Sequence, residues 1–318
     1  MKRKKFFKKI ICVGALLLST ISCKHNYVQT PRTSLKVTII KVNTTQELLE
    51  VLKKHGLWQL EGLTKMPPIV IKNLPPDLKY VRDERLKRKL FIRTIMPSAL
   101  FALAEVEKER MQLKEILAET DYPTHLDSNI LVKTIGSQKA AFVRHLTAKY
   151  RTNVTDELLK RVNTVPLSLL LAQAAIESNW GTSRFALEGN NLFGIWTYKR
   201  DGMVPLYRDT EAQHKVARYS SILEATRNYL YNLNVGWAYT EFREARSHTM
   251  DALELAQYLF RYSQTGLLYV NRLQDIINMY NLKEYDIYEA HFKPYLAQFN
   301  LCCLDNQSLL STAKGICE

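Results

Sequence analysis

The sequence predicts a predominantly helical fold with one small β excursion. Apolar residues recur at three- and four-residue steps through most of the chain, which is the spacing of helix faces. Residues 197–219, "TYKRDGMVPLYRDTEAQHKVARY", lose that spacing, gain Gly and Pro, and alternate as a β-hairpin does. At 318 residues and 46% hydrophobic content, the chain is long enough for one substantial core with a small appendage.

The first residues, "MKRKKFFKKIICVGALLLSTISC", have the pattern of an export signal. A cationic segment precedes an apolar run from Ile10 to Ile21, and that run is shorter than the roughly 20 residues of a membrane-spanning helix. The end of the run resembles the lipobox of bacterial lipoproteins, with Thr20 where leucine is usual. The resemblance implies cleavage after residue 22, lipidation of Cys23, and an exported protein anchored in the cell envelope, in the outer membrane facing the periplasm if the cell is Gram-negative.

The chain is basic, with a formal charge of +14. Six of the basic residues lie within 1–22, so cleavage would leave a formal charge of +8. For an exported protein, this charge favours an anionic wall polymer or a phospholipid surface over nucleic acid as partner, although a solvated surface also explains it. We predict no nucleic-acid partner and a monomer.

The cysteines predict one disulfide and one spare thiol. Cys12 would leave with the signal and Cys23 would carry lipid, which leaves Cys302, Cys303 and Cys317 in an oxidising compartment. Adjacent cysteines rarely bridge each other without strain, so Cys317 is expected to pair with one of the other two. No cysteine pair has zinc-finger spacing and the histidines form no HExxH motif, so neither metal nor cofactor is predicted.

The segment 23–65 is expected to hold a polar tether and a small α/β element. "SLKVTIIKV" alternates like a strand, and "TTQELLEVLKKHG" predicts a helix closed by Gly56. The main domain is expected over 66–300, followed by a cysteine-containing tail over 301–318.

Helices dominate the predicted main domain. The proline pairs of "MPPIVIKNLPPDL" predict a connecting strap, and the next 36 or so residues predict an amphipathic helix kinked at Pro97. "TVPLSLLLAQAAIESNWG" is the most apolar helix. Beyond the hairpin, "SILEATRNYLYNL", "ALELAQYLFRY" and "VNRLQDIINMYNL" restore helical spacing.

One carboxylate, Glu177, stands at the end of the most apolar helix. It would share a helix face with Leu170, Gln173 and Ala174, and Gly181 is the expected C-terminal cap. Burial and the negative end of the helix dipole should both raise its pKa, as a general acid requires near neutral pH. The alternative is an exposed glutamate at a helix end.

The segment after Glu177, "SNWGTSRFALEGNNLFGIW", is rich in amides and aromatic rings. Amides can bind sugar hydroxyls and rings can stack on sugar faces. Trp180, Asn191, Phe193 and Trp196 are therefore candidate substrate-binding residues, although each aromatic side chain could equally belong to the core.

"AQAAIESNWGTSRFALEGNNLFGIW" resembles the catalytic segment of glycoside hydrolase family 73, the bacterial endo-β-N-acetylglucosaminidases, and most closely its Bax-type branch. The similarity extends through "LPPDLKYVRDERLKRKLFIRTIMP", "HKVARYSSILEATRNYL" and "RYSQTGLLYVNRL", over residues 66–290. It implies an α+β, lysozyme-like helical domain with a small β-hairpin lobe, which cleaves the glycan of peptidoglycan after N-acetylglucosamine.

The resemblance also implies roles for individual residues. The catalytic acid falls on Glu177, and the second carboxylate falls on Glu211, with Asp209 in reserve; alternatively, the substrate itself assists a single carboxylate. Cleft aromatic residues of the family match Tyr262 and Tyr269.

Two rival functions remain at this point. A lytic transglycosylase would share the helical fold and a single glutamate, but "NNLFGIW" argues against it. A wall-binding lipoprotein or scaffold would keep the groove without chemistry, which leaves a buried carboxylate unused. The sequence does not fix the stereochemistry, the peptide preference of the glycan, a regulatory partner or the role of residues 34–65.

Overall fold

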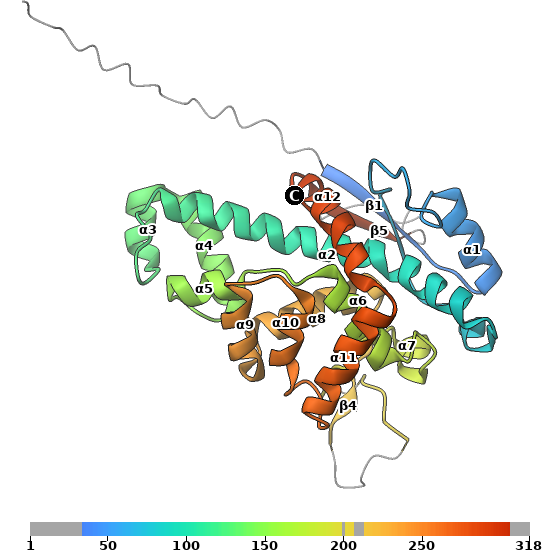
Figure 1. The fold of residues 1–318 in the computed structure, drawn as a ribbon. Helices are drawn as coiled ribbons and strands as arrows, with labels where there is room; N and C mark the ends of the chain where they lie inside the picture. Colours follow the sequence, from blue (N-terminus) through green and yellow to red (C-terminus); the bar gives the residue numbers. More distant parts are fainter. Residues whose placement is uncertain (1–33, 199–200, 207–212, 306–318) are drawn as a thin grey trace, which may run out of the picture. The chain divides into compact units, whose positions relative to one another are not determined.

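The computed structural model describes residues 34–198, 201–206 and 213–305, which belong to one compact unit. These residues form a mostly helical fold with two small sheets (Figure 1), which confirms the predicted fold class. In the part of the chain so described, none of the helices has the length and apolar character needed to cross a membrane.

Helix α2 (Glu84–Ala118) is the central element of the main core. Asp83 caps it by accepting hydrogen bonds from the backbone N–H groups of Arg85 and Leu86, and the helix continues through Pro97. Every side chain from Leu90 to Ala104 is buried, because one strand and three helices pack against α2. They are β2 (Ile69–Ile71), α6 (Leu167–Ser178), α8 (Ile222–Val235) and α12 (Tyr285–Ala297). The predicted amphipathic pattern is therefore wrong for the middle of the helix.

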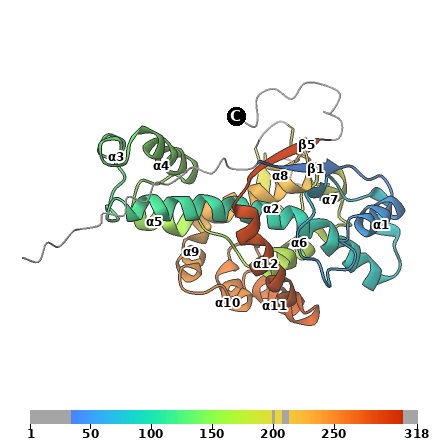
Figure 2. The same ribbon diagram turned by 90° about the horizontal axis from the view of Figure 1, so that it is seen from above.

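A three-stranded parallel sheet joins the two ends of the described chain. Its order is β2 (Ile69–Ile71), β1 (Ser34–Ile40), β5 (Asn300–Asp305), as Figure 2 shows for β1 and β5. Thr38 pairs with Ile69, and Ser34 pairs with Asn300. The strand expected in "SLKVTIIKV" is thus confirmed, whereas β5 crosses from the predicted main domain into the predicted tail.

Helix α1 (Thr45–Lys54) follows β1, as predicted. The Thr44 hydroxyl accepts a hydrogen bond from the backbone N–H of Glu47 at the helix start, and Gly56 lies just beyond its end with φ of 72°. The predicted strap holds β2 and a single 3₁₀ turn, η1 (Pro76–Tyr80), in agreement with its proline pairs.

The other helices pack in two groups. The distal end of α2 and the next three helices share a small core around Leu113, Leu146 and Leu158. The remaining helices join the main core with the middle of α2. The helices not yet bounded are α3 (Ser128–Ile135), α4 (Ser137–Tyr150), α5 (Thr155–Arg161), α7 (Arg184–Gly189), α9 (Thr240–Arg246), α10 (Ala252–Ala256) and α11 (Leu267–Met279). Short 3₁₀ turns are η2 (Trp237–Tyr239), η3 (Gln257–Leu259) and η4 (Leu282–Glu284).

The predicted hairpin between helices α7 and α8 is confirmed. Strands β3 (Trp196–Thr197) and β4 (Lys215–Val216) pair antiparallel, with Trp196 opposite Val216. Met203 extends the ladder by exchanging two backbone hydrogen bonds with Val216. The hairpin therefore begins directly after the "NNLFGI" loop that follows Glu177 in the chain.

Candidate active site

The start of α6 is fixed by two carboxylates of α12. The backbone N–H of Leu167 donates to Glu289 Oε2 at 2.6 Å, and that of Ser168 donates to Asp286 Oδ1 at 2.8 Å. The Ser168 hydroxyl donates to Asp286 Oδ2 at 2.7 Å. Negative charge at a helix N-terminus satisfies free N–H groups and complements the dipole, so these contacts hold α6, and with it Glu177, against α12.

The end of α6 differs in detail from the expectation. Asn179, not Gly181, is the C-cap, and Asn179, Trp180 and Gly181 all have positive φ, of 50°, 55° and 80°. A β-carbon on Gly181 would lie 2.5 Å from Leu74 Cδ1, so the left-handed run requires glycine there for space as well as for conformation. This sharp reversal leaves Glu177 on the last turn of the helix.

Glu177 ends a chain of buried hydrogen-bonding side chains. Tyr229 donates its hydroxyl to Gln173 Oε1 at 2.6 Å, and Gln173 Nε2 donates to the Tyr269 hydroxyl at 2.9 Å. Tyr269 in turn is hydrogen-bonded to Glu177. Because the Tyr269 oxygen already accepts from Gln173, its own proton is free to be donated to the Glu177 carboxylate.

Burial raises the pKa of Glu177 to about 7. The Tyr269 hydrogen bond and the Arg272 charge act in the opposite direction, because both stabilise the carboxylate. The raised pKa agrees with the expectation from the sequence, with burial as its main cause. At neutral pH the group is therefore divided between its acid and its conjugate base, which suits proton transfer in both directions.

Two predicted cleft tyrosines, Tyr262 and Tyr269, lie together at this site. Their rings stack with centroids 5.6 Å apart, and the Tyr262 hydroxyl donates to the backbone carbonyl of Phe193 at 2.7 Å. Burial holds the pKa of both phenols well above the usual value, with the Glu177 charge adding to the effect. Both therefore stay protonated and act as hydrogen-bond donors.

The backbone of the loop after α7 passes close to the Glu177 carboxylate at Gly194. Asn191 organises it: the side-chain amide donates to the carbonyls of Ile195 and Ala217, and its oxygen accepts from the N–H groups of Phe193 and Ile195. Gly194 has φ of 64°, and a β-carbon there would lie 2.8 Å from Glu177 Oε2. Glycine is thus required where the loop passes the carboxylate.

The structure places the predicted aromatic residues in three different settings. Phe193 is buried and stacks on Tyr229 with centroids 4.2 Å apart. Trp196 is 54% exposed on β3 and stacks on the His214 ring, also at 4.2 Å. Trp180 packs edge-on against Phe91 and Tyr280, with centroids 5.7 Å and 4.9 Å away. Only Phe193, through Tyr229 and Tyr262, joins the network around Glu177.

Four of the residues predicted from the sequence lie outside the described part of the chain. They are Asp209, Glu211, Cys23 and Cys317. The second carboxylate, the lipid attachment and the disulfide therefore stay predictions. Within the residues that the structure describes, no cluster of three or more His, Cys, Asp or Glu side chains could hold a metal ion.

Several site residues were not predicted as such from the sequence. The sequence places Gln173 one turn before Glu177 on the same helix face, but no sequence pattern links it to the tyrosines. Tyr229, Gly194 and Arg272 were missed. A polar amide four residues before the acid, inside an apolar helix, is the one local signal that could have revealed the network.

A glutamate of near-neutral pKa, held on a helical core beside a β-hairpin, is the kind of site that glycoside hydrolases use as general acid. Comparisons agree with this class. Residues 152–282 match the model of the glucosaminidase family, described as mannosyl-glycoprotein endo-beta-N-acetylglucosaminidase. The chain is 31% identical to protein bax of Escherichia coli (strain K12) over 207 residues, which cover 62% of this chain and 71% of that protein. The chain belongs to the glucosaminidase family, as its sequence resemblance implied.

Two further similarities accompany these. The chain is 23% identical to the exo-glucosaminidase LytG of Bacillus subtilis (strain 168) over 222 residues, 65% of this chain and 69% of that protein. The crystal structure of the catalytic domain of the autolysin Auto from Listeria monocytogenes matches with 26% identity and a TM-score of 0.33, and the match covers 46% of this chain and 85% of that one.

Proposed function

We propose that the protein is a peptidoglycan hydrolase that cleaves the glycan strand after N-acetylglucosamine as an endo-β-N-acetylglucosaminidase. The observation that carries the proposal is Glu177, a carboxylic acid with a pKa of about 7 in a family of glycosidases. In the reaction, Glu177 donates its proton to the leaving glycosidic oxygen. Tyr269 and Arg272 then stabilise the carboxylate that forms, and Glu177 can accept a proton from the incoming water.

The second participant is proposed to be Glu211, with Asp209 in reserve. Both lie outside the described residues, in the stretch of sequence between strands β3 and β4. Glu211→Gln should lower kcat severely with little change in KM, and Asp209→Asn should lower it less. If Asp209→Asn is the more damaged variant, Asp209 takes the role. If both variants keep their turnover, the acetamido group of the substrate is the second participant.

We propose that the predicted substrate-binding residues have two roles, and that their exposure to solvent distinguishes them. We propose that Trp196, which is 54% exposed at the start of the hairpin and stacks on His214, offers the other face of its ring to a sugar. The Asn191 amide bonds to backbone groups, the Phe193 ring stacks on Tyr229 of α8, and the Tyr262 hydroxyl binds the Phe193 carbonyl. We therefore assign these three residues the role of holding the loop backbone near Glu177.

Mass analysis of wall fragments after digestion tests the reaction. The proposal expects products with N-acetylglucosamine at a free reducing end. Anhydro sugars would instead identify a lytic transglycosylase, and intact strands a wall-binding protein without chemistry. One relative is named an exo-glucosaminidase, so the alternative within the family is an exo-acting enzyme. An endo enzyme shortens strands early, whereas an exo enzyme releases small fragments from strand ends throughout digestion.

The place of action is proposed to be the cell envelope, with the protein exported and attached through lipid on Cys23. Attachment by acyl chains would hold the basic domain close to the anionic wall. Processing should be sensitive to globomycin, and Cys23→Ser should release the protein from the detergent phase. A variant that still partitions into detergent unchanged would contradict the anchor.

A further inference from the structure

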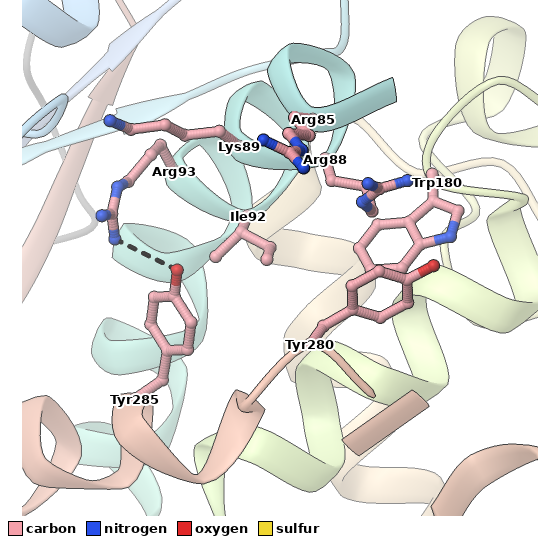
Figure 3. Close-up of a pocket in the computed structure, with 8 residues that line it drawn as sticks. All are labelled: Arg85, Arg88, Lys89, Ile92, Arg93, Trp180, Tyr280 and Tyr285. Atoms are coloured by element: carbon pink, nitrogen blue, oxygen red, sulfur yellow. Dashed lines mark hydrogen bonds between the residues drawn. The ribbon is translucent and has the colours of Figure 1, made fainter. Parts of the chain in front are cut away.

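A cationic pocket of about 400 Å³ lies beside the start of α2 (Figure 3). Five of its lining residues come from one face of α2, because their spacing follows the helical repeat. The other three come from the turn after α6, the end of α11 and the start of α12. The lining residues are Arg85, Arg88, Lys89, Ile92, Arg93, Trp180, Tyr280 and Tyr285, of which four are basic and none is acidic.

Two of the three arginines of this pocket, Arg88 and Arg93, lie over its aromatic rings. The Arg88 guanidinium lies 4.7 Å from the Tyr280 centroid and 6.0 Å from that of Trp180, and these two rings meet edge-on at 4.9 Å. The Arg93 guanidinium lies 5.5 Å from the Tyr285 ring, on the other side of Ile92 in Figure 3. Stacking fixes each guanidinium plane while leaving its N–H edges free to bind.

The charge of the pocket is incompletely balanced within the described residues. Arg93 is only 8% exposed, its Nε has no hydrogen-bond partner there, and Nη1 makes a single long contact of 3.4 Å with the Tyr285 hydroxyl. Among the described residues, Arg88 has one carboxylate within 4 Å, that of Glu84 at 3.8 Å, which also binds Lys87 at 2.6 Å. A buried guanidinium with an unused donor is costly unless an anion occupies the site.

We propose that this pocket binds a carboxylate of the peptide stems that peptidoglycan glycan strands carry. The inference rests on the proposed function and names a second recognition element for that substrate. Glu177 does not line the pocket, but Trp180, which does, follows it by three residues and lies just past the end of α6. A planar carboxylate matches the arginine fork, and the aromatic walls suit the apolar part of a short peptide. A concave pocket fits a chain end better than it fits a membrane surface.

Binding of a soluble stem peptide tests the proposal without requiring hydrolysis. Calorimetry on the full chain carrying Glu177→Gln should detect binding, and adding Arg88→Gln should weaken the affinity about tenfold, as expected for one lost charge-assisted hydrogen bond. Lys114→Gln, which removes an exposed charge from the distal part of the same helix, should leave affinity unchanged. The same peptide with amidated carboxylates should not bind. Equal binding of both peptides would overturn the proposal.

Kinetics supply the second test. Strands with intact stems should show a KM about tenfold higher in Arg88→Gln than in the wild type, whereas strands stripped of their stems should show no difference between the two. An equal rise in KM for both substrates would show that Arg88 supports the fold or binds the glycan, and it would contradict the proposal. If wild-type hydrolysis is absent but the peptide binds, the proposed reaction fails and the pocket assignment stands.

Anionic phospholipid vesicles and inorganic phosphate are the competing ligands. Neither should displace the stem peptide at equimolar concentration. If the wild type binds the vesicles but not the peptide, and Arg88→Gln abolishes vesicle binding, the pocket is a headgroup site and the proposal is wrong. If phosphate alone binds as tightly as the peptide, the site recognises a free anion instead. Circular dichroism melting of Arg88→Gln, expected to match the wild type within a few degrees, excludes misfolding as the cause.

Discussion

At the scale of single residues, the pKa of Glu177 depends on two opposing effects, burial and the hydrogen bond from the Tyr269 hydroxyl. Burial favours the neutral acid, and the Tyr269 hydroxyl favours the carboxylate. Tyr269→Phe should therefore raise the pKa of Glu177 above about 7 and move the high-pH limb of the kcat profile toward higher pH. The pH dependence of hydrolysis measures this shift.

The matched control is Tyr262→Phe, because its hydroxyl binds the Phe193 carbonyl at 2.7 Å and not Glu177. Both variants should lose roughly 1–3 kcal/mol of stability, since each leaves a buried polar group without its partner. Only Tyr269→Phe should move the pH limb. A limb that stays in place, or moves to lower pH, would show that Tyr269 does not stabilise the carboxylate.

Replacement of the acid itself separates catalysis from stability. Glu177→Gln should lower turnover by about 10²- to 10⁴-fold, the usual contribution of general acid catalysis. The folded-state pKa of about 7 lies above the ordinary 4.5, so protonated Glu177 stabilises the fold below pH 4.5, and that stability is lost as pH rises through about 7. At pH 8 the neutral variant should be more stable than wild type by up to about 3 kcal/mol.

Urea unfolding at pH 4 and pH 8 measures this difference. The two proteins should be nearly equal in stability at pH 4. Near-wild-type turnover in Glu177→Gln would refute its catalytic role. Equal stability at pH 8 would instead refute the burial of an ionisable acid.

Gly194 tests how close backbone must come to the acid. Gly194→Ala should destabilise the protein by about 1 kcal/mol through its positive φ and should also displace the Glu177 carboxylate, lowering kcat. Gly62→Ala is the matched control, because Gly62 has φ of 78° but open space where the β-carbon would lie. Comparable kcat losses in both variants would contradict a role for the close approach.

At the scale of elements, α6 carries the acid at one end and is fixed at the other. Asp286→Ala leaves the N–H and hydroxyl of Ser168 without their acceptor, and it should cost about 1–2 kcal/mol of stability. Thermal melting measures the loss, and Asp275→Ala, an exposed change on α11, is the control. Because Glu177 lies at the far end of the helix, kcat at low temperature should change little. A large kcat loss without a lower melting temperature would contradict a capping role.

The sequence predicts elements better than it predicts their contacts. Helical spacing indicated α6, and the change to alternation at residue 197 indicated the hairpin, because both signals are local. The links from Gln173 to Tyr229 and Tyr269 span 56 and 96 positions, so no local pattern contains them. The middle of α2 was predicted amphipathic because its charged ends, not its buried centre, dominate the pattern.

At the scale of the whole molecule, the sheet makes the end of the described chain part of the fold. β5 pairs with β1 over six residues, from Ser34 with Asn300 to Ile39 with Asp305. A chain ending at Phe299 should lose this ladder, expose an edge of β1 and melt at lower temperature. A chain ending at Asp305 keeps the strand and serves as control. Equal melting of the two chains would show that β5 does not contribute to stability.

The same sheet has a consequence for how the protein folds. Parallel pairing of β1 with β5 closes almost the whole described chain into one loop. Closing so long a loop costs conformational entropy, and this cost must be met before the strand pairing can stabilise the protein. The helical core around α2 can form earlier from more local contacts. During synthesis, the β1 edge that pairs with β5 therefore stays unpaired until β5 emerges. Refolding should show a fast helical phase followed by a slower phase that brings protection of β1 amides from hydrogen exchange, and the chain ending at Phe299 should lack the slow phase.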